Sequence, residues 1–319
     1  MSPRPPLIAR AVLALAVCSA ACSSQPATFI TVLTGSTSGV YYPLGVGLSQ
    51  IFRTAIPEAT LSVQATAASA ENLNLLQAER GEFAFTLGDV LVDAWEGNAS
   101  AGFKTPLKKL RMVAGIYLNY VQIVANADSG VKTLDDLKGK RISVGAPGSG
   151  TELNARAIMK AAGLTYDDFA RVEYLPFGES VDLMKNRQLD ITLQSAGLGV
   201  ASLRDLAASV RIVIVPIPPE VVQNVGNPVY QPGVIPAGTY EGQDTPVATA
   251  TIQNFLVTHD RVPEDLIHRM TKAMFEHLDQ LVASHVSAKD IRRDEAIRNR
   301  PVPLHPGAAA YYKDVGLLE

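Results

Sequence analysis

The chain has 319 residues, of which 47% are hydrophobic and 18% are charged, and its formal net charge at pH 7 is −3. This length and composition are enough for two ordinary domains with buried cores. The small negative charge, and the lack of any Lys/Arg-rich run interleaved with aromatic residues, exclude an ordinary nucleic-acid-binding protein. An acidic protein can still bind an anion if backbone N–H groups supply the local positive potential.

The first 22 residues have the composition of an export signal. Arg4 and Arg10 lie before an apolar run over residues 11–17, and small residues follow up to Cys22. The run is too short for a permanent membrane-spanning helix, so we predict a signal peptide and a periplasmic protein. Without these residues the net charge is −5.

Cys22 follows two alanines and resembles the acceptor site of a bacterial lipoprotein. Ser19 stands where such signals usually carry a branched apolar residue, so cleavage without lipidation stays open as an alternative. A lipid on Cys22 would be the protein's only membrane contact. Because Cys18 is the only other cysteine, the mature chain can have neither a disulfide nor a cysteine metal site.

The first third of the chain alternates between strand and helix patterns. Strands are predicted at residues 29–33, 59–63 and 83–87, and the helices that follow them at residues 44–52, 69–78 and 90–95. Such alternation is typical of a parallel sheet with helical crossovers. Ligands of these sheets collect beyond the carboxyl ends of the strands, where the connecting loops lie.

The rest of the chain continues as α/β. Strands are predicted at residues 112–117 and 120–125, either as one strand or as two, and at 141–144, 172–175, 190–193, 212–215 and 247–256. Helices are predicted at residues 134–137, 153–162, 180–185, 263–282 and 290–300. Residues 216–242 are rich in Pro and Gly and are predicted to be irregular.

Two Gly/Ser/Thr loops, Gly35–Pro43 and Gly145–Glu152, each join a predicted strand to a predicted helix. A loop of this kind presents unpaired N–H groups at the positive end of a helix dipole, which suits an anion such as a carboxylate. Each loop alone could be only a capped turn. Two of them, more than a hundred residues apart, predict a ligand held between two lobes.

The sequence contains no complete catalytic motif. The first loop has Thr37 where a nucleophile elbow has serine, and Glu152 follows the second loop where a P-loop has lysine. Gly45 and Gly47 lack the third glycine of a dinucleotide motif and lie inside a predicted helix, so we interpret them as close-packing residues. We therefore predict no catalytic residue and no cofactor.

The histidines and Asp89 add no catalytic or metal site. No histidine pair has the spacing of a helical zinc site, and we interpret His305, between two prolines, as structural. Asp89 has no nucleophile or metal partner, so a ligand contact or a helix cap is the preferred interpretation.

Taken together, several segments resemble the substrate-binding proteins of tripartite ATP-independent periplasmic (TRAP) transporters, of the TAXI type. The matching segments are residues 35–43, 69–73, 134–140 leading into 148–151, 235–240 and 304–308. The resemblance implies a small carboxylate ligand, such as glutamate or a C4–C5 dicarboxylate, and TRAP membrane subunits as partners. This chain departs from the family pattern at Ala68, where glycine is common, and at Leu87–Gly88, where a polar pair is common.

The fold that the resemblance implies is an α/β, two-lobed periplasmic-binding-protein type II fold. Each lobe is expected to be a mainly parallel sheet flanked by helices, and two strands form the hinge. Lobe one would comprise residues 28–119 and 249–319, and lobe two residues 120–248. The strand crossings are expected at residues 117–124 and 247–251. We expect a monomer.

The predicted ligand contacts come from both lobes. One carboxylate is assigned to Thr37, Ser38 and the amides from Gly39 onward, and the other end of the ligand to Ser149, Gly150 and Thr151. Tyr41 or Tyr42 would form a wall of the pocket. The second tier of contacts is Ser69, Asn72, Asp89, Gln194 and Ser195.

Three alternatives remain open from the sequence. An ABC-type receptor for a sulfonate, a phosphonate or a thiamine precursor shares the fold. A transferase on the same scaffold is disfavoured by the leader and by the lack of an acid/base pair. A lipid-anchored or sensor-coupled protein without a transport role is the third.

Overall fold

The computed structural model describes residues 28–319. The predicted leader, with Cys22, lies outside the described residues. Within residues 28–319, every helix is too short or too polar to cross a membrane.

The strands are β1 Thr28–Leu33, β2 Ala59–Gln64, β3 Phe83–Leu87, β4 Leu110–Asn126, β5 Arg141–Ser143, β6 Arg171–Glu173, β7 Ile191–Ala196, β8 Ile212–Val215, β9 Gln231–Ile235 and β10 Val247–His259. The α-helices are α1 Tyr41–Ala55, α2 Ser69–Gln77, α3 Gly88–Glu96, α4 Gly150–Ala161, α5 Phe177–Lys185, α6 Ala201–Ser209, α7 Pro219–Asn224, α8 Glu264–Glu276, α9 Leu278–Ser284 and α10 Pro306–Asp314. Short 3₁₀ helices are η1 Ala99–Ala101, η2 Ala127–Ser129, η3 Asp135–Leu137, η4 Tyr166–Asp168 and η5 Val286–Asp290.

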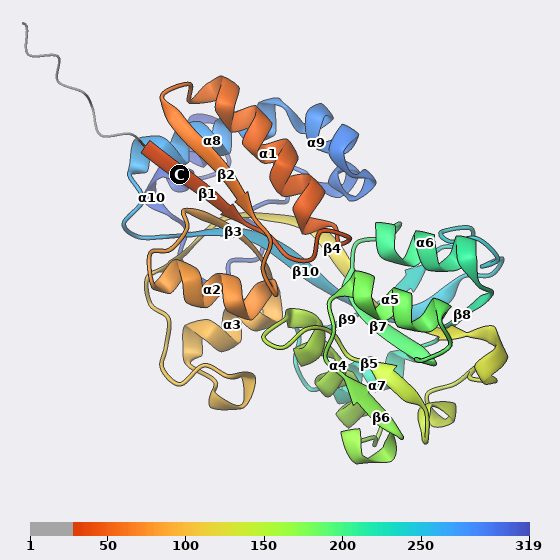
Figure 1. Cartoon of the computed structure of the whole chain (residues 1–319). Coiled ribbons are helices and arrows are strands. Elements are labelled where there is room, and N and C mark those ends of the chain that lie inside the picture. The colour runs from red at the N-terminus through yellow and green to blue at the C-terminus, as the bar shows by residue number, and fades with distance from the viewer. Residues whose placement is uncertain (1–27) are drawn as a thin grey trace, which may run out of the picture.

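The molecule has two lobes, as expected (Figure 1). The first lobe contains β1–β3, α1–α3 and α8–α10, and the second contains β5–β9 and α4–α7. The two long strands β4 and β10 pair with each other and run from one lobe into the other. A single sheet therefore passes through the whole molecule, in the order β2-β1-β3-β10-β4-β7-β5-β6.

Strand direction is more mixed than the expected parallel sheets. β1 is parallel to β2 and β3, and β5 is parallel to β6 and β7. β10 is antiparallel to β3, β4 and β9, while β4 is antiparallel to β7 and β8. β4 and β10 are antiparallel because β4 carries the chain out of the first lobe and β10 carries it back. The expected crossings, residues 117–124 and 247–251, fall within β4 and β10.

The chain after β8 departs from the prediction in three places. Residues 216–242, expected to be irregular, contain α7 and β9, because Pro219 lies in the first turn of α7, where its missing N–H costs nothing, and β9 pairs with β10. The single helix expected over residues 263–282 is divided at His277, whose φ of −127° and ψ of 37° are not helical. The helix expected over residues 290–300 is absent, because part of this segment lies along β4, where the Gly115 N–H donates to the Ala296 carbonyl at 2.7 Å. It lacks the apolar stripe that would hold a helix against the core.

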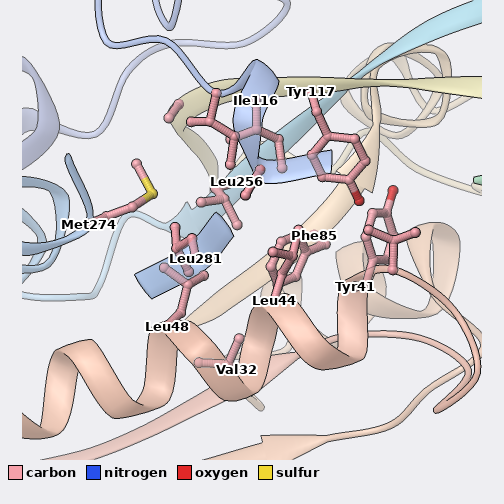
Figure 2. Packing of buried hydrophobic residues seen from close by; sticks show 14 of the residues in the cluster. Val32, Tyr41, Leu44, Leu48, Phe85, Ile116, Tyr117, Leu256, Met274 and Leu281 are labelled. Carbon is pink, nitrogen blue, oxygen red and sulfur yellow. The ribbon is translucent and has the colours of Figure 1, made fainter. Parts of the chain in front are cut away.

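The helix after the first Gly/Ser loop, α1, packs very closely on the sheet at Gly45 and on α9 at Gly47. A Cβ on Gly45 would lie 2.4 Å from Thr34 Cγ2, and a Cβ on Gly47 would lie 2.4 Å from Ser284 Oγ, which confirms the predicted packing role of both glycines. At the start of α1, the Tyr41 ring stacks on Phe85 with 5.0 Å between centroids. In Figure 2 the hydroxyl groups of Tyr41 and Tyr117 point toward one another above this stack.

Candidate functional site

A cavity of about 220 Å³ lies between the lobes. The first lobe and the adjoining part of β4 contribute Gly35, Ser36, Gly39, Val40, Tyr41, Thr66, Ala67, Ala68, Ser69, Leu87, Tyr117 and Asn119. The second lobe contributes Ala146, Ser149, Gly150, Thr151, Pro176, Phe177, Ser195 and Ala196. The volume is below the roughly 300–1,000 Å³ of drug-sized sites, so the cavity suits a small solute.

Four helices begin at the cavity wall: α1 and α2 from the first lobe, α4 and α5 from the second. The first N–H groups of a helix have no partner within it, and the helix dipole adds a positive potential there. The residues that precede α1, α2 and α5, namely Val40, Ala68 and Pro176, cannot cap these groups with a side chain. Only α4 is capped, by Ser149 Oγ, which accepts from the Glu152 N–H at 3.1 Å.

The cavity wall contains no Asp, Glu, Lys, Arg or His among residues 28–319. Within the same residues, no group of three or more His, Cys, Asp or Glu side chains could hold a metal ion. Peptide groups and hydroxyls therefore supply the polarity of the cavity. Converging helix N-termini of this kind favour one negative charge on a ligand.

Within residues 28–319, two hydroxyls at this wall have no hydrogen-bond partner. Tyr117 Oη and Ser195 Oγ are both buried and unpaired. Burial, aided by the nearby Tyr41, raises the pKa of Tyr117 well above its usual value, so its hydroxyl keeps a proton to donate. A buried hydroxyl without a partner is costly, so these two groups are matched to a ligand that accepts hydrogen bonds.

A chain of buried hydrogen bonds holds the wall between the lobes. The Tyr41 hydroxyl of α1 donates to Asn254 Oδ1 of β10 at 2.5 Å. Asn254 Nδ2 donates to Asn119 Oδ1 of β4 at 2.7 Å, and Asn119 Nδ2 donates to the Ser195 carbonyl of β7 at 3.0 Å. The chain thus connects the first lobe to the second through both long strands.

The lobes also touch directly beside the cavity. The Glu71 N–H of α2 donates to the Gly148 carbonyl at 3.3 Å, and the Ser202 N–H of α6 donates to the Ser38 carbonyl at 3.3 Å. Gly148 and Ser38 are each next in the chain to a residue of the cavity wall, Ser149 and Gly39. The structure therefore shows the lobes closed on the cavity.

Seven of the predicted contact residues line this cavity: Gly39, Tyr41, Ser69, Ser149, Gly150, Thr151 and Ser195. They come from both lobes and from three of the four helix N-termini. Their contact with a ligand stays a prediction.

Six predicted residues lie outside the cavity wall: Thr37, Ser38, Tyr42, Asn72, Asp89 and Gln194. Thr37 is exposed. Asn72 Nδ2 donates to the carbonyls of Thr34 and Phe85, which ties the loops of the first lobe together. Gln194 Oε1 accepts from the Ser202 hydroxyl within the second lobe at 2.6 Å.

Several cavity residues were not predicted from the sequence. Tyr117 and Asn119 lie in the middle of β4, and Phe177 begins α5 without a glycine-rich loop before it. No local motif marks any of the three. Ala68 was noted only as a departure from a family pattern, but its φ of 74° is a conformation that favours glycine.

Residues 32–316 match the family model described as the NMT1-like family. Among solved structures, the chain is similar to the alkanesulfonate-binding protein SsuA from Xanthomonas axonopodis pv. citri bound to MOPS. That match has 14% identity and a TM-score of 0.50, over 93% of this chain and 96% of that one.

Two further structures give somewhat higher TM-scores. PhnD1 from Prochlorococcus marinus, in complex with methylphosphonate, matches with 10% identity and a TM-score of 0.56, over 84% of this chain and 92% of that one. The periplasmic binding protein BugD matches with 9% identity and a TM-score of 0.57, over 92% and 95%. At these identities the likeness establishes the fold.

The expected TAXI-type membership is wrong, because the family model that matches nearly the whole described chain is the NMT1-like one. The glutamate or dicarboxylate ligand and the TRAP partner, which depended on that resemblance, lose their support with it. The quoted segments include the starts of α1, α2 and α4, which this fold places at its cavity. They indicate the architecture and do not distinguish one transporter class from another.

Proposed function

The chain belongs to the NMT1-like family, and from this premise we propose that it captures a small sulfonate and delivers it to an ABC-type membrane transporter. It is a periplasmic solute-binding protein and not an enzyme.

The observation that carries the proposal is the charge of the cavity. Four helix N-termini converge on it, and among residues 28–319 no ionisable acid or base other than the two tyrosines lines it. Hydrogen bonds from neutral donors to a charged group contribute about 1.5–3 kcal/mol each, so a few of them hold one negative charge without an arginine. A second charge would have no cation beside it.

The shape of the donor set favours a sulfonate over a carboxylate. Donors approach the cavity from α1, α2, α4 and α5, and so from both lobes. A sulfonate has three equivalent oxygens and carries a single charge throughout the biological pH range. Its apolar substituent would rest against Leu87, Ala146 and Phe177, which line the same cavity.

Two of the similar structures agree with this class of ligand. One of them is bound to MOPS, which is a sulfonate, and the other to methylphosphonate. A phosphonate is the second candidate, and its singly protonated form has the same charge as a sulfonate. Near neutral pH a substantial fraction is doubly charged, which this cavity disfavours.

Calorimetric titration of the purified protein at pH 7 tests the proposal. Ethanesulfonate is expected to bind, methylphosphonate to bind more weakly, and glutamate and succinate to give no heat of binding. Tighter binding of glutamate or succinate than of ethanesulfonate, or no binding of any of the four, would refute the sulfonate assignment.

A further inference from the structure

Outside the cavity wall, one buried cluster joins the two lobes through an ionisable group. Asp89 Oδ2, at the start of α3, accepts from Asn154 Nδ2 of α4 and from the Tyr230 hydroxyl, each at 2.6 Å. Asn154 Nδ2 also lies 2.7 Å from the Tyr230 oxygen, which closes a triangle. Asp89 and Asn154 are at most 3% exposed, and Tyr230 is 6% exposed.

The cluster lies at the boundary between the lobes. Asp89 precedes β4 in the chain, whereas both of its partners belong to the stretch between β4 and β10 that forms the second lobe (Figure 1). Separation of the lobes would remove both hydrogen bonds and expose the carboxyl group to water. The triangle can exist only when the lobes are closed.

The same elements also form the ligand cavity. Asp89 is two residues beyond Leu87, and Asn154 is one helical turn beyond Gly150, and both Leu87 and Gly150 line the cavity. Movement of α4 toward α3 would therefore close the cavity and form the triangle of hydrogen bonds at the same time.

Among residues 28–319, no cation acts on the carboxyl group. The ionisable groups that act on it are Asp93 on the next turn of α3, Tyr230, and Tyr41 of α1. Burial raises the pKa of Asp89 to about 6, and the hydrogen bond from Tyr230 and the Val90 N–H offset this only in part. Asn154 Oδ1 is buried and has no donor in the part of the chain that the structure describes, so the cluster contains an unused acceptor.

We propose that Asp89, Asn154 and Tyr230 form an interlobe latch, and that closing of the lobes is coupled to the uptake of one proton by Asp89. The inference rests on the proposed function in that a solute is taken to close the lobes. A closed lobe pair holds the carboxyl group out of water, and the neutral acid is the form that is buried at lower cost.

The direction of the pH dependence follows from the linkage between proton binding and lobe closure. Asp89 binds a proton more tightly in the closed form than in the open form, where its pKa is that of an exposed aspartate. Closure, and with it affinity for the solute, therefore increases as the pH falls through the pKa of the closed form. With a pKa of about 6 when closed and 3.8 when open, affinity should rise about tenfold from pH 7.5 to pH 5.

The test measures the dissociation constant for ethanesulfonate at pH 5 and at pH 7.5 in the wild-type protein and in variants. Asp89→Asn keeps an acceptor for both partners but cannot titrate, so its affinity should be equal at the two pH values and no weaker than wild type at pH 7.5. Asp93→Asn is the matched control, because Asp93 is a half-buried acid on the same helix that bonds Asn98 within its own lobe. It should retain most of the tenfold change, reduced slightly because the Asp93 charge adds to the raised pKa of Asp89.

A second measurement follows closure without calorimetry. Spin labels at Arg53→Cys and Lys132→Cys, both exposed and one on each lobe, report the distance between the lobes, with Cys18 and Cys22 replaced by Ser. The closed population should increase from pH 7.5 to pH 5 in the wild type and stay constant in Asp89→Asn.

The outcomes separate the two proposals. If ethanesulfonate does not bind but the distance change depends on Asp89, the sulfonate assignment fails and the latch stands. If ethanesulfonate binds with the same affinity at both pH values in every variant, the latch is refuted and the sulfonate assignment stands.

Discussion

A Cβ atom on Gly150 would lie 2.7 Å from the Oγ of Ser69. Gly150 begins α4 in the second lobe and Ser69 begins α2 in the first, so two helix N-termini from opposite lobes meet without room for a methyl group. The same Cβ would lie 2.6 Å from Leu87 Cδ1. The size of residue 150 therefore limits how far the lobes can close.

The first prediction is that Gly150→Ala weakens solute binding without destabilising the fold. Affinity for ethanesulfonate should fall about tenfold or more, equivalent to about 1.4 kcal/mol. The free energy of unfolding should not decrease, because alanine favours a helix over glycine by up to ~1 kcal/mol. Calorimetry and urea denaturation measure the two effects.

Gly178→Ala is the control for this substitution. It also lies in the first turn of a helix at the cavity, but its Cβ would meet only Ser38 Oγ, at an ordinary 3.4 Å. Its affinity should be within about twofold of wild type. Equal losses in both variants would show that the effect is not the contact with Ser69.

A second prediction concerns the unpaired hydroxyl of Tyr117. Tyr117→Phe should weaken ethanesulfonate binding at least tenfold, because a hydrogen bond to a charged group contributes about 1.5–3 kcal/mol. The ligand-free protein should be as stable as wild type or more stable, since the lost hydroxyl is buried without a partner. Tyr312→Phe should show the reverse, as its hydroxyl donates to the Val113 carbonyl at 3.0 Å inside the core. Unchanged affinity in Tyr117→Phe would remove this hydroxyl from the site.

The backbone of Ala68 leads to a third prediction. Its φ of 74° and ψ of −141° lie in a region that only glycine occupies easily, and the strain costs about 1–3 kcal/mol. Ala68→Gly should raise the free energy of unfolding by about 1 kcal/mol after the greater chain entropy of unfolded glycine is subtracted. Ala67→Gly, at the preceding residue, should lower the free energy of unfolding, because residue 67 has no positive φ. Urea denaturation compares them, and a loss of stability in Ala68→Gly would contradict the strain.

The fourth prediction is a pH dependence of stability at His305, which the sequence indicated as structural. Its ring accepts from the Gly307 N–H at the start of α10 and lies 3.0 Å from the Val262 carbonyl, and burial lowers its pKa to about 4. Since the folded pKa is below the unfolded value, the stabilisation is present above pH 6.5 and is lost as the pH falls toward 4. The slope from this residue should be at most about 1.4 kcal/mol per pH unit.

Comparison with His305→Asn isolates that slope. Asparagine can cap α10 but does not titrate. The difference in unfolding free energy between the two proteins should change between pH 6.5 and 4.5 and be constant above pH 7. A constant difference over the whole range would assign the acid sensitivity to other groups.

Local chemistry made much of this fold predictable. Apolar runs predicted β1, β3 and β7, and Gly/Ser loops before an apolar helical face predicted the starts of α1 and α4. The same reasoning excluded an enzyme, since each catalytic motif failed at a particular residue, as at Thr37 and Glu152. It failed for the transporter class, because those loops belong to the fold and do not report which transporter it serves.

The sequence by itself determined the α/β architecture, the two lobes and the two Gly/Ser/Thr loops that lead into α1 and α4, because helix periodicity and the residues that begin a helix depend on neighbouring residues. Only the tertiary structure decided which side chains meet. Tyr117 and Phe177 line the cavity. Asp89 lies outside the cavity wall and bonds Asn154 and Tyr230, which are 65 or more residues away in the chain. Local sequence patterns do not predict such contacts, because the packing of one lobe against the other brings these distant segments together.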